Sequence, residues 1–273
     1  MPRHGSVGVP RRGLAVVTGA SAGIGRAFAQ RLAGRGYDLL LVARDRARLD
    51  ALRAGLIERH GVAVECFPAD LACDDEVTRL IERLRRAPAL VLLVNNAGFG
   101  TSGLLVDIDP ARQSEMLHLH VLAPMRLSQA VLPLFRHERG GAIVNVASVA
   151  AFAVSAGHVN YCASKTYLLA FSDGLAAEVA GTGVRVQALC PGFTRSEFHA
   201  RAELDDTAIP RWLWMSTDAV VEASLRQLER GGPVLCVPGF RYRLAVGLLR
   251  LLPRPLAVRL ARRRARLSSA ARR

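Results

Sequence analysis

Residues 14–25 read LAVVTGASAGIG, an apolar run of strand length followed by a turn that contains three glycines. A stretch of helical period comes next. Glycine allows a sharp turn, lets the backbone approach a pyrophosphate, and points the positive end of the following helix at that anion. A glycine-rich turn also occurs for geometry alone. The stretch therefore predicts a strand–turn–helix unit and a candidate phosphate-binding turn.

The same alternation continues outward through residues 13–240, as is typical of βα units around a parallel sheet. We expect one doubly wound α/β domain with a seven-stranded parallel sheet, order 3-2-1-4-5-6-7, and helices on both faces. The expected strands are Leu14–Thr18, Asp38–Ala43, Val62–Phe67, Leu90–Asn95, Ala142–Ala147, Val184–Leu189 and Val234–Val237. The expected helices lie near 23–34, 45–59, 74–86, 110–137, 158–180 and 217–230.

Composition agrees with such a domain. Of 273 residues, 51% are apolar, which is enough to bury a core, and only 5% are aromatic, as in sheets of aliphatic strands. The five cysteines are scattered without a C-x-x-C pair, so we expect reduced thiols and a cytoplasmic location. We expect no signal peptide, and no run reaches the roughly eighteen apolar residues of a membrane span.

The net charge of +14 is concentrated at the two ends of the chain. Residues 241–273 contain eleven arginines and no acid, and residues 1–12 contain three more, so residues 13–240 are formally neutral. We therefore divide the chain into a basic N-terminal arm (1–12), the α/β domain (13–240) and an arginine-rich amphipathic tail (241–273).

Leucines alternate with arginines in the tail, which suits a helix at an anionic membrane surface, worth about 1 kcal/mol per basic residue. A C-terminal helix that packs on the domain or on a second subunit fits the pattern equally well. Nucleic-acid binding is not expected, because the tail lacks interleaved aromatic residues beyond Tyr242.

Two further strand ends carry polar residues. Arg44 follows Asp38–Ala43, where a dinucleotide fold places the residue that faces the adenosine ribose, and arginine there suits a 2′-phosphate. The alternative is a solvent-exposed arginine at the start of the next helix. Asn96-Ala97-Gly98 follows another strand, at the edge where open sheets bind ligands. Asn95 contributes there, ties neighbouring strands together through side-chain hydrogen bonds, or does both.

Tyr161 and Lys165 lie four residues apart in a helical stretch, so their side chains share one face. Lys165 is the single lysine of the chain. A phenol with a pKa of about 10 is a poor base, but an ammonium about 4 Å away is worth about 4 kcal/mol, close to three pK units. We expect Lys165 to bring the pKa of Tyr161 into the range of general acid–base catalysis.

Together, Thr18–Gly25, the Asn-Asn-Ala-Gly motif at 95–98, Ser148, the Tyr161/Lys165 pair and Pro191-Gly192 resemble the short-chain dehydrogenase/reductases. The resemblance covers residues 13–240 and implies a single Rossmann-type domain that moves hydride between NADP(H) and a carbonyl or alcohol. It implies that Tyr161 exchanges the proton with the substrate oxygen, Ser148 holds that oxygen, and Lys165 assists both the phenol and the nicotinamide ribose. It further implies contacts to NADP(H) from Gly19, Ser21, Gly23, Ile24, Gly25, Arg44, Asp70, Leu71, Asn96, Ala97, Gly98, Tyr161, Lys165, Pro191, Gly192, Phe193 and Thr194.

His120 is a departure from that family, which usually has a proton-relaying asparagine at this position. An imidazole also donates and accepts protons, so we count His120 with the catalytic residues, the alternative being a core or surface histidine. The exchange His120→Asn is then expected to keep comparable activity. His118 lies two residues away, the wrong spacing for a shared helix face, so no metal site is expected.

Apolar residues are frequent between Phe193 and Met215, a long segment that closes over substrate in the family. They predict an apolar carbonyl or alcohol as substrate, or else packing against a second subunit. The resemblance implies a homodimer or homotetramer.

The competing hypothesis is a catalytically weak NADP(H)-binding scaffold or sensor. The presence of Ser148, Tyr161 and Lys165 together argues against it. An isomerase or epimerase of this fold would usually have an extra substrate domain, which the sequence lacks.

Overall fold

The computed structural model describes residues 12–87, 89–198 and 209–270, with the backbone alone for 263–270. A seven-stranded parallel sheet runs through it in the order β3-β2-β1-β4-β5-β6-β9. This confirms the predicted order, because β9 is the seventh strand of this sheet along the chain. The strands are β1 (Leu14–Thr18), β2 (Asp38–Ala43), β3 (Val64–Pro68), β4 (Leu90–Asn95), β5 (Gly141–Val146), β6 (Val184–Leu189) and β9 (Leu235–Cys236).

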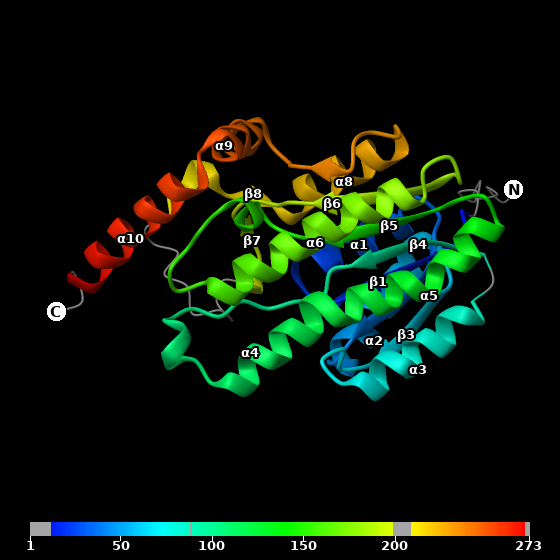
Figure 1. The fold of residues 1–273 in the computed structure, drawn as a ribbon. Coiled ribbons are helices and arrows are strands. Elements are labelled where there is room, and N and C mark those ends of the chain that lie inside the picture. Colours follow the sequence, from blue (N-terminus) through cyan, green and yellow to red (C-terminus); the bar gives the residue numbers. More distant parts are fainter. Residues whose placement is uncertain (1–11, 88, 199–208, 271–273) are drawn as a thin grey trace, which may run out of the picture.

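Helices cover both faces of the sheet, as predicted (Figure 1). The first face is covered by α1 (Gly23–Ala33), α2 (Arg46–His60) and α8 (Thr217–Glu229). The second is covered by α3 (Asp74–Arg85), α5 (Ala123–His137) and α6 (Val159–Glu178). Side chains alternate along each strand, so that Val17 packs toward α1 and Val16 toward the second layer.

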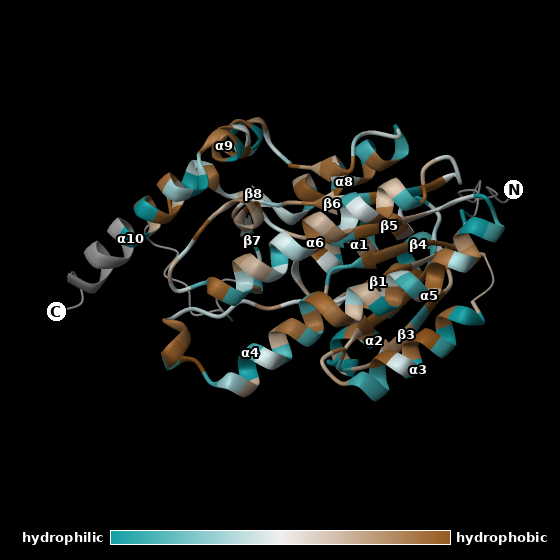
Figure 2. Cartoon of the chain, viewed as in Figure 1, coloured by the Kyte–Doolittle hydropathy of each residue, from teal (hydrophilic) through white to brown (hydrophobic). Residues whose placement is uncertain are grey.

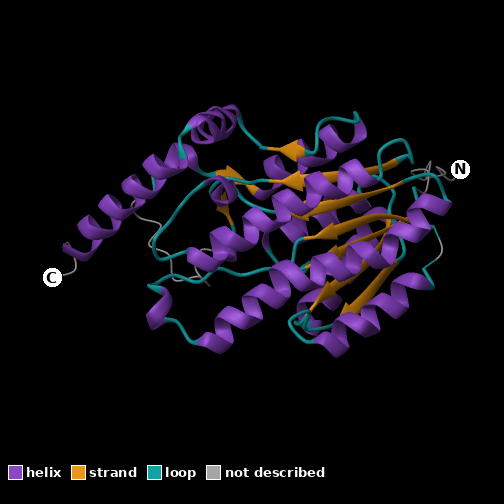
Figure 3. Ribbon diagram, viewed as in Figure 1, coloured by secondary structure: helices purple, strands orange, loops and turns teal. Residues whose placement is uncertain are grey.

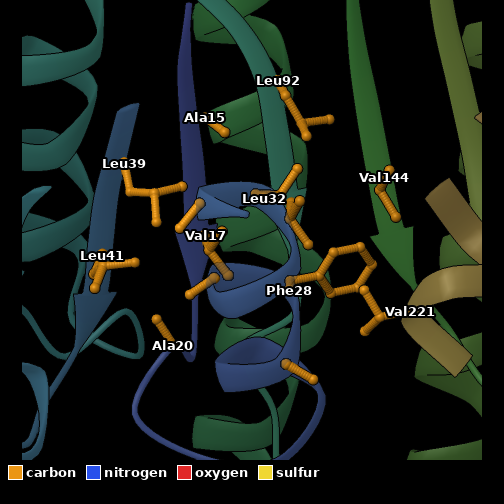
Figure 4. Packing of buried hydrophobic residues seen from close by; sticks show 14 of the residues in the cluster. Ala15, Val17, Ala20, Phe28, Leu32, Leu39, Leu41, Leu92, Val144 and Val221 are labelled. Atoms are coloured by element: carbon orange, nitrogen blue, oxygen red, sulfur yellow. The ribbon is translucent and has the colours of Figure 1, made fainter. Parts of the chain in front are cut away.

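Phe28 and Leu32 show how α1 is held on the sheet. They lie one helical turn apart, are fully buried, and share a cluster with the strand side chains Val17 and Val144, and the Phe28 ring points toward Val221 (Figure 4). Each contributes about 1.5–3 kcal/mol by burial. Because α1 starts at the glycine-rich turn, this packing fixes the direction of its N-terminus.

The prediction of one continuous helix over 110–137 is wrong, because the helix is interrupted. The structure has α4 (Pro110–Leu117), then a π-helical turn, η2 (His118–Leu122), and then α5. Pro124 explains the interruption, because it has no N–H to donate to the carbonyl of residue 120 and its ring crowds that carbonyl. Turns of this kind are frequent at functional sites, and His120 lies inside this one.

A second, two-stranded sheet pairs β7 (Thr194–Arg195) with β8 (Met215–Ser216) in parallel. It lies in the segment predicted as a long loop, where two-residue strands leave no periodic signal. A short 3₁₀ helix, η4 (Arg211–Leu213), precedes β8. Residues 199–208 of the predicted loop are outside the described residues, as are residues 1–11 of the predicted arm.

The tail folds as α9 (Phe240–Leu251) and α10 (Arg254–Ala270). Tyr242 and Val246 of α9 are buried in a cluster with Ala147, Leu168 and Cys190. The first tail helix is therefore packed on the domain, while α10 extends away from it (Figure 1). None of the helices in the described part of the chain is long and apolar enough to cross a bilayer.

Candidate active site

The carboxyl ends of the parallel strands lie at one edge of the sheet (Figure 3). Every residue predicted to contact the dinucleotide, apart from Tyr161 and Lys165, follows one of these ends. Gly19–Gly25 follow β1, Arg44 follows β2, Asp70 and Leu71 follow β3, Asn96–Gly98 follow β4, and Pro191–Thr194 follow β6. The fold therefore gathers segments that lie far apart in the sequence along one edge.

Hydrogen bonds hold the turns after β1 and β4 together. The Thr18 hydroxyl accepts bonds from the N–H groups of Asn96 (2.9 Å) and Ala97 (3.0 Å), and the Asn96 side chain donates to the Thr18 carbonyl (2.8 Å). A Cβ at Gly25 would lie 2.2 Å from the carbonyl oxygen of Gly19. Only glycine permits this close packing of α1 against the turn.

The N-terminus of α1 suits a phosphate. Its N-cap, Ala22, provides no side-chain cap, and the first turn contains no acidic residue. The first N–H groups of a helix have no acceptor within it, so they are available to an anion. These residues fit the pyrophosphate of a dinucleotide.

Arg44 lies at the end of β2 with 61% of its side chain exposed. One guanidinium nitrogen lies 3.6 Å from an Asp70 carboxylate oxygen and 3.5 Å from one of Glu115. Exposed pairs at such distances are weak. The guanidinium is therefore held at this edge by contacts that an incoming phosphate can replace.

Tyr161 and Lys165 face the same space from α6. The Lys165 ammonium lies 5.7 Å from the centre of the Tyr161 ring and donates a hydrogen bond to the carbonyl of Val146 (3.0 Å) at the end of β5. Ser148 follows β5, and its hydroxyl accepts a bond from the Ala150 N–H (3.1 Å), which caps a short 3₁₀ turn, η3 (Val149–Phe152). The structure thus brings together the three predicted catalytic side chains of Ser148, Tyr161 and Lys165.

The expected lowering of the Tyr161 pKa is wrong in this arrangement. Burial raises the pKa of the phenol to about 12, and the Ser148 hydroxyl offsets this only in part. Burial also lowers the pKa of Lys165 to about 8. Burial is thus the main influence on the pKa of the phenol, and the Lys165 ammonium bonds to the Val146 carbonyl. Tyr161 is therefore protonated at neutral pH.

His120 is completely buried, and both of its ring nitrogens have partners. Nε2 accepts a hydrogen bond from the Phe99 N–H (3.1 Å), and Nδ1 lies 3.0 Å from the Ser164 hydroxyl oxygen. Ser164 donates its own proton to the carbonyl of Tyr161 (2.8 Å), so Nδ1 must carry the imidazole proton. Burial and the charge of Lys165 hold the pKa of His120 well below its usual value.

His120 thus connects the segment after β4 to the backbone of Tyr161. The two rings meet edge to face, with centroids 5.9 Å apart. Both nitrogens have partners within the protein, as the core-histidine alternative expects, and the proton relay stays a prediction.

Two residues that support the site, Asn145 and Tyr242, were not predicted from the sequence. Asn95 donates to Asn145 on the neighbouring strand (2.8 Å), and Asn145 donates to Ser172 of α6 (2.9 Å), so Asn95 does tie strands together. The signal for Asn145 was an amide inside an apolar strand. Tyr242 accepts a bond from the Phe193 N–H (2.9 Å) and donates to the Leu213 carbonyl (2.7 Å). No local pattern predicts that contact.

The fold, with these segments gathered at one edge of the sheet, is that of the dinucleotide-binding α/β enzymes. The model of the short chain dehydrogenase family matches residues 13–207. An uncharacterised oxidoreductase of Myxococcus xanthus is 34% identical over 252 residues, which are 91% of this chain and 96% of that protein.

Two solved structures are also similar. A short-chain dehydrogenase from Sphingobium yanoikuyae in complex with NADPH has a TM-score of 0.81 at 38% identity, covering 86% of this chain and 93% of that one. A bulky-bulky ketone specific alcohol dehydrogenase from Comamonas testosteroni has a TM-score of 0.77 at 32% identity, covering 90% and 96%. The chain belongs to the short-chain dehydrogenase family and is an oxidoreductase.

Proposed function

We propose that this enzyme reduces an apolar ketone or aldehyde to the alcohol, with NADPH as hydride donor. The observation that carries the proposal is the meeting of Ser148, Tyr161 and Lys165 at the sheet edge. The cofactor supplies the hydride for the carbonyl carbon. Tyr161 supplies the proton for the carbonyl oxygen, Ser148 holds that oxygen by a hydrogen bond, and Lys165 places a positive charge beside the phenol.

The protonation state of Tyr161 fits its proposed role as proton donor. A phenol with a pKa of about 12 has its proton at neutral pH and can donate it, whereas alcohol oxidation needs the phenolate. The charge of Lys165, present below about pH 8, stabilises the phenolate that forms as the proton leaves. A screen of long-chain and cyclic ketones, followed by NADPH absorbance, tests the proposal. NADPH binding without turnover of any carbonyl would instead support the scaffold hypothesis.

NADP(H) rather than NAD(H) is proposed from Arg44, and the NADPH bound to the Sphingobium enzyme supports it. A bidentate guanidinium–phosphate contact is strong, and NADH lacks the phosphate. We expect Arg44→Asp to lower kcat/KM with NADPH at least tenfold and to change it with NADH much less. Arg53, an exposed arginine further along α2, is the control, because Arg53→Asp makes the same charge change away from the edge. Equal effects of the two substitutions, or equal loss with both cofactors, would contradict the assignment.

An apolar substrate is proposed from the aromatic residues that follow β6. Trp212 is 59% exposed, and the guanidinium of Arg241 lies 5.1 Å from its ring. Phe198 approaches the Tyr161 ring at 5.8 Å, and Phe193 approaches Trp214 at the same distance. The Comamonas enzyme, described as specific for bulky-bulky ketones, supports a bulky ligand.

Trp212→Ala is expected to raise KM for 2-decanone about tenfold while changing KM for acetone by less than about twofold. A long alkyl chain loses the apolar area that the indole would cover, and a short one does not reach it. Steady-state kinetics with both ketones on one preparation provide the measurement. A parallel rise for the two ketones would place the indole outside the substrate site.

A homodimer or homotetramer is part of the proposal. A shallow hollow on the outer side of α4 and η2 supports it, since apolar side chains line it, among them the exposed Leu117 and Leu122. The cytoplasmic location inferred from the cysteines stays a prediction.

A further inference from the structure

The outer face of α9 presents an apolar stripe. Phe240, Leu244, Leu248 and Leu251 recur at spacings of four, four and three residues, which places them on one side of the helix. Their exposed fractions run from 56% to 81%. Large apolar side chains exposed together on a helix mark an interaction site.

The stripe is not a core face left open, because the opposite side of α9 is already packed on the domain. Tyr242 and Val246 fill that role, with exposed fractions of 8% and 3%. Figure 2 shows brown apolar segments next to teal polar ones along α9. The helix therefore has two apolar sides, of which one holds it in place and the other faces outward.

The charged side chains of the two tail helices all have one sign. Arg241, Arg243 and Arg250 flank it on α9, and the exposed Arg254, Arg259 and Arg262 follow on α10. The last acidic residue of the sequence is Glu229, so nothing within the tail neutralises these arginines. Two exposed leucines, Leu256 and Leu260, continue the apolar character onto α10.

The tail leaves the molecule at the same end as the carboxyl edge of the sheet (Figures 1 and 3). Other apolar side chains are exposed near that edge. Leu104, Leu105 and Val106 follow β4 in the chain, with Val106 86% exposed, and Trp212 is held by Arg241 of α9. The end of the molecule that carries the active site thus combines apolar side chains with arginines.

We propose that α9 and α10 dock this end of the enzyme on an anionic lipid bilayer. The leucine stripe enters the region between headgroups and acyl chains, and the flanking arginines bind lipid phosphates. A second copy of the same surface is a poor partner, because a symmetric interface would bring arginines against arginines with no tail acid between them. The docking does not depend on the proposed reaction, although it would bring an apolar ketone dissolved in the membrane close to Tyr161.

Full-length protein should be used for the test, because removing α9 would also remove Tyr242 from the Phe193 N–H. We would measure sedimentation with vesicles of phosphatidylcholine alone and with added phosphatidylglycerol. The triple variant Arg243→Gln/Arg250→Gln/Arg259→Gln is expected to bind the anionic vesicles roughly a hundredfold more weakly, since each basic residue near the surface contributes about fivefold. The variant Leu244→Asn/Leu248→Asn/Leu251→Asn should bind the anionic vesicles at least about tenfold more weakly than the parent.

The matched control is Arg59→Gln/Arg85→Gln/Arg136→Gln, which removes the same charge from exposed arginines on α2, α3 and α5. It should bind anionic vesicles nearly as the parent does, and thermal unfolding should be similar for all three variants. Equal losses in the control and in the tail variants would overturn the proposal. So would unchanged binding of the leucine variant, or a concentration-dependent dimer that the leucine variant abolishes without any change in lipid binding.

Discussion

Tyr161→Phe is expected to lower the turnover number for carbonyl reduction at least about a thousandfold, while NADPH affinity and the melting temperature stay close to those of the parent. Phenylalanine keeps the ring and its contacts to His120 and Phe198 but removes the hydroxyl that we propose as the proton donor. Positioned general acids contribute about 10²- to 10⁴-fold to rates. Single-turnover kinetics and a fluorescence titration with NADPH would separate the chemical step from binding.

Tyr167 provides the matched control. It lies on the same helix and stacks on Phe171 with ring centroids 5.7 Å apart, so Tyr167→Phe removes one hydroxyl away from Ser148 and Lys165. Its turnover should stay within about twofold of the parent. Substantial activity in Tyr161→Phe would exclude the phenol as proton donor.

His120→Ala is expected to reduce the free energy of unfolding by about 2–5 kcal/mol. The substitution leaves a cavity in a fully buried position and removes the hydrogen-bond partners of the Phe99 N–H and the Ser164 hydroxyl. His120→Asn should lose less unfolding free energy, because an amide also donates and accepts hydrogen bonds. Its enzymatic activity is predicted to stay comparable to that of the parent. Urea unfolding at neutral pH measures both. The exposed His137 is the control, and a loss no larger than that of His137→Ala would contradict the buried role.

The same histidine should make stability depend on pH. Its pKa is lowered in the folded protein, so the unfolded chain binds a proton more readily once the pH falls below about 6.5. The stabilising contribution of the neutral ring is thus present above that pH and is lost toward acid, by up to about 1.4 kcal/mol per pH unit. When the free energy of unfolding is measured with urea at several pH values between 5 and 8, it should change less with pH for His120→Asn than for the parent.

Most helices of the domain and most strand ends were predictable, because each depends on a local pattern, whereas the interruption within 110–137 was missed. Strands in parallel βα units are short apolar runs, and their helices repeat every 3.6 residues. The predicted strand bounds differ from the observed ones by at most two residues, and β1, β2, β4 and β6 agree fully. The position of Arg44 and Asn96 at one edge of the sheet was also predictable from the sequence, because the carboxyl ends of parallel strands lie on the same side.

The sequence by itself thus determined the sheet, its order, and the residues that gather at its carboxyl edge. Only the tertiary structure decided what those residues experience there: the raised pKa of Tyr161, the two bonded nitrogens of His120, and the contact of Tyr242 with Phe193. Fold class follows from periodicity along the chain. Burial and hydrogen-bond pairing depend on contacts between residues 21, 44 and 49 positions apart, and no local pattern contains them.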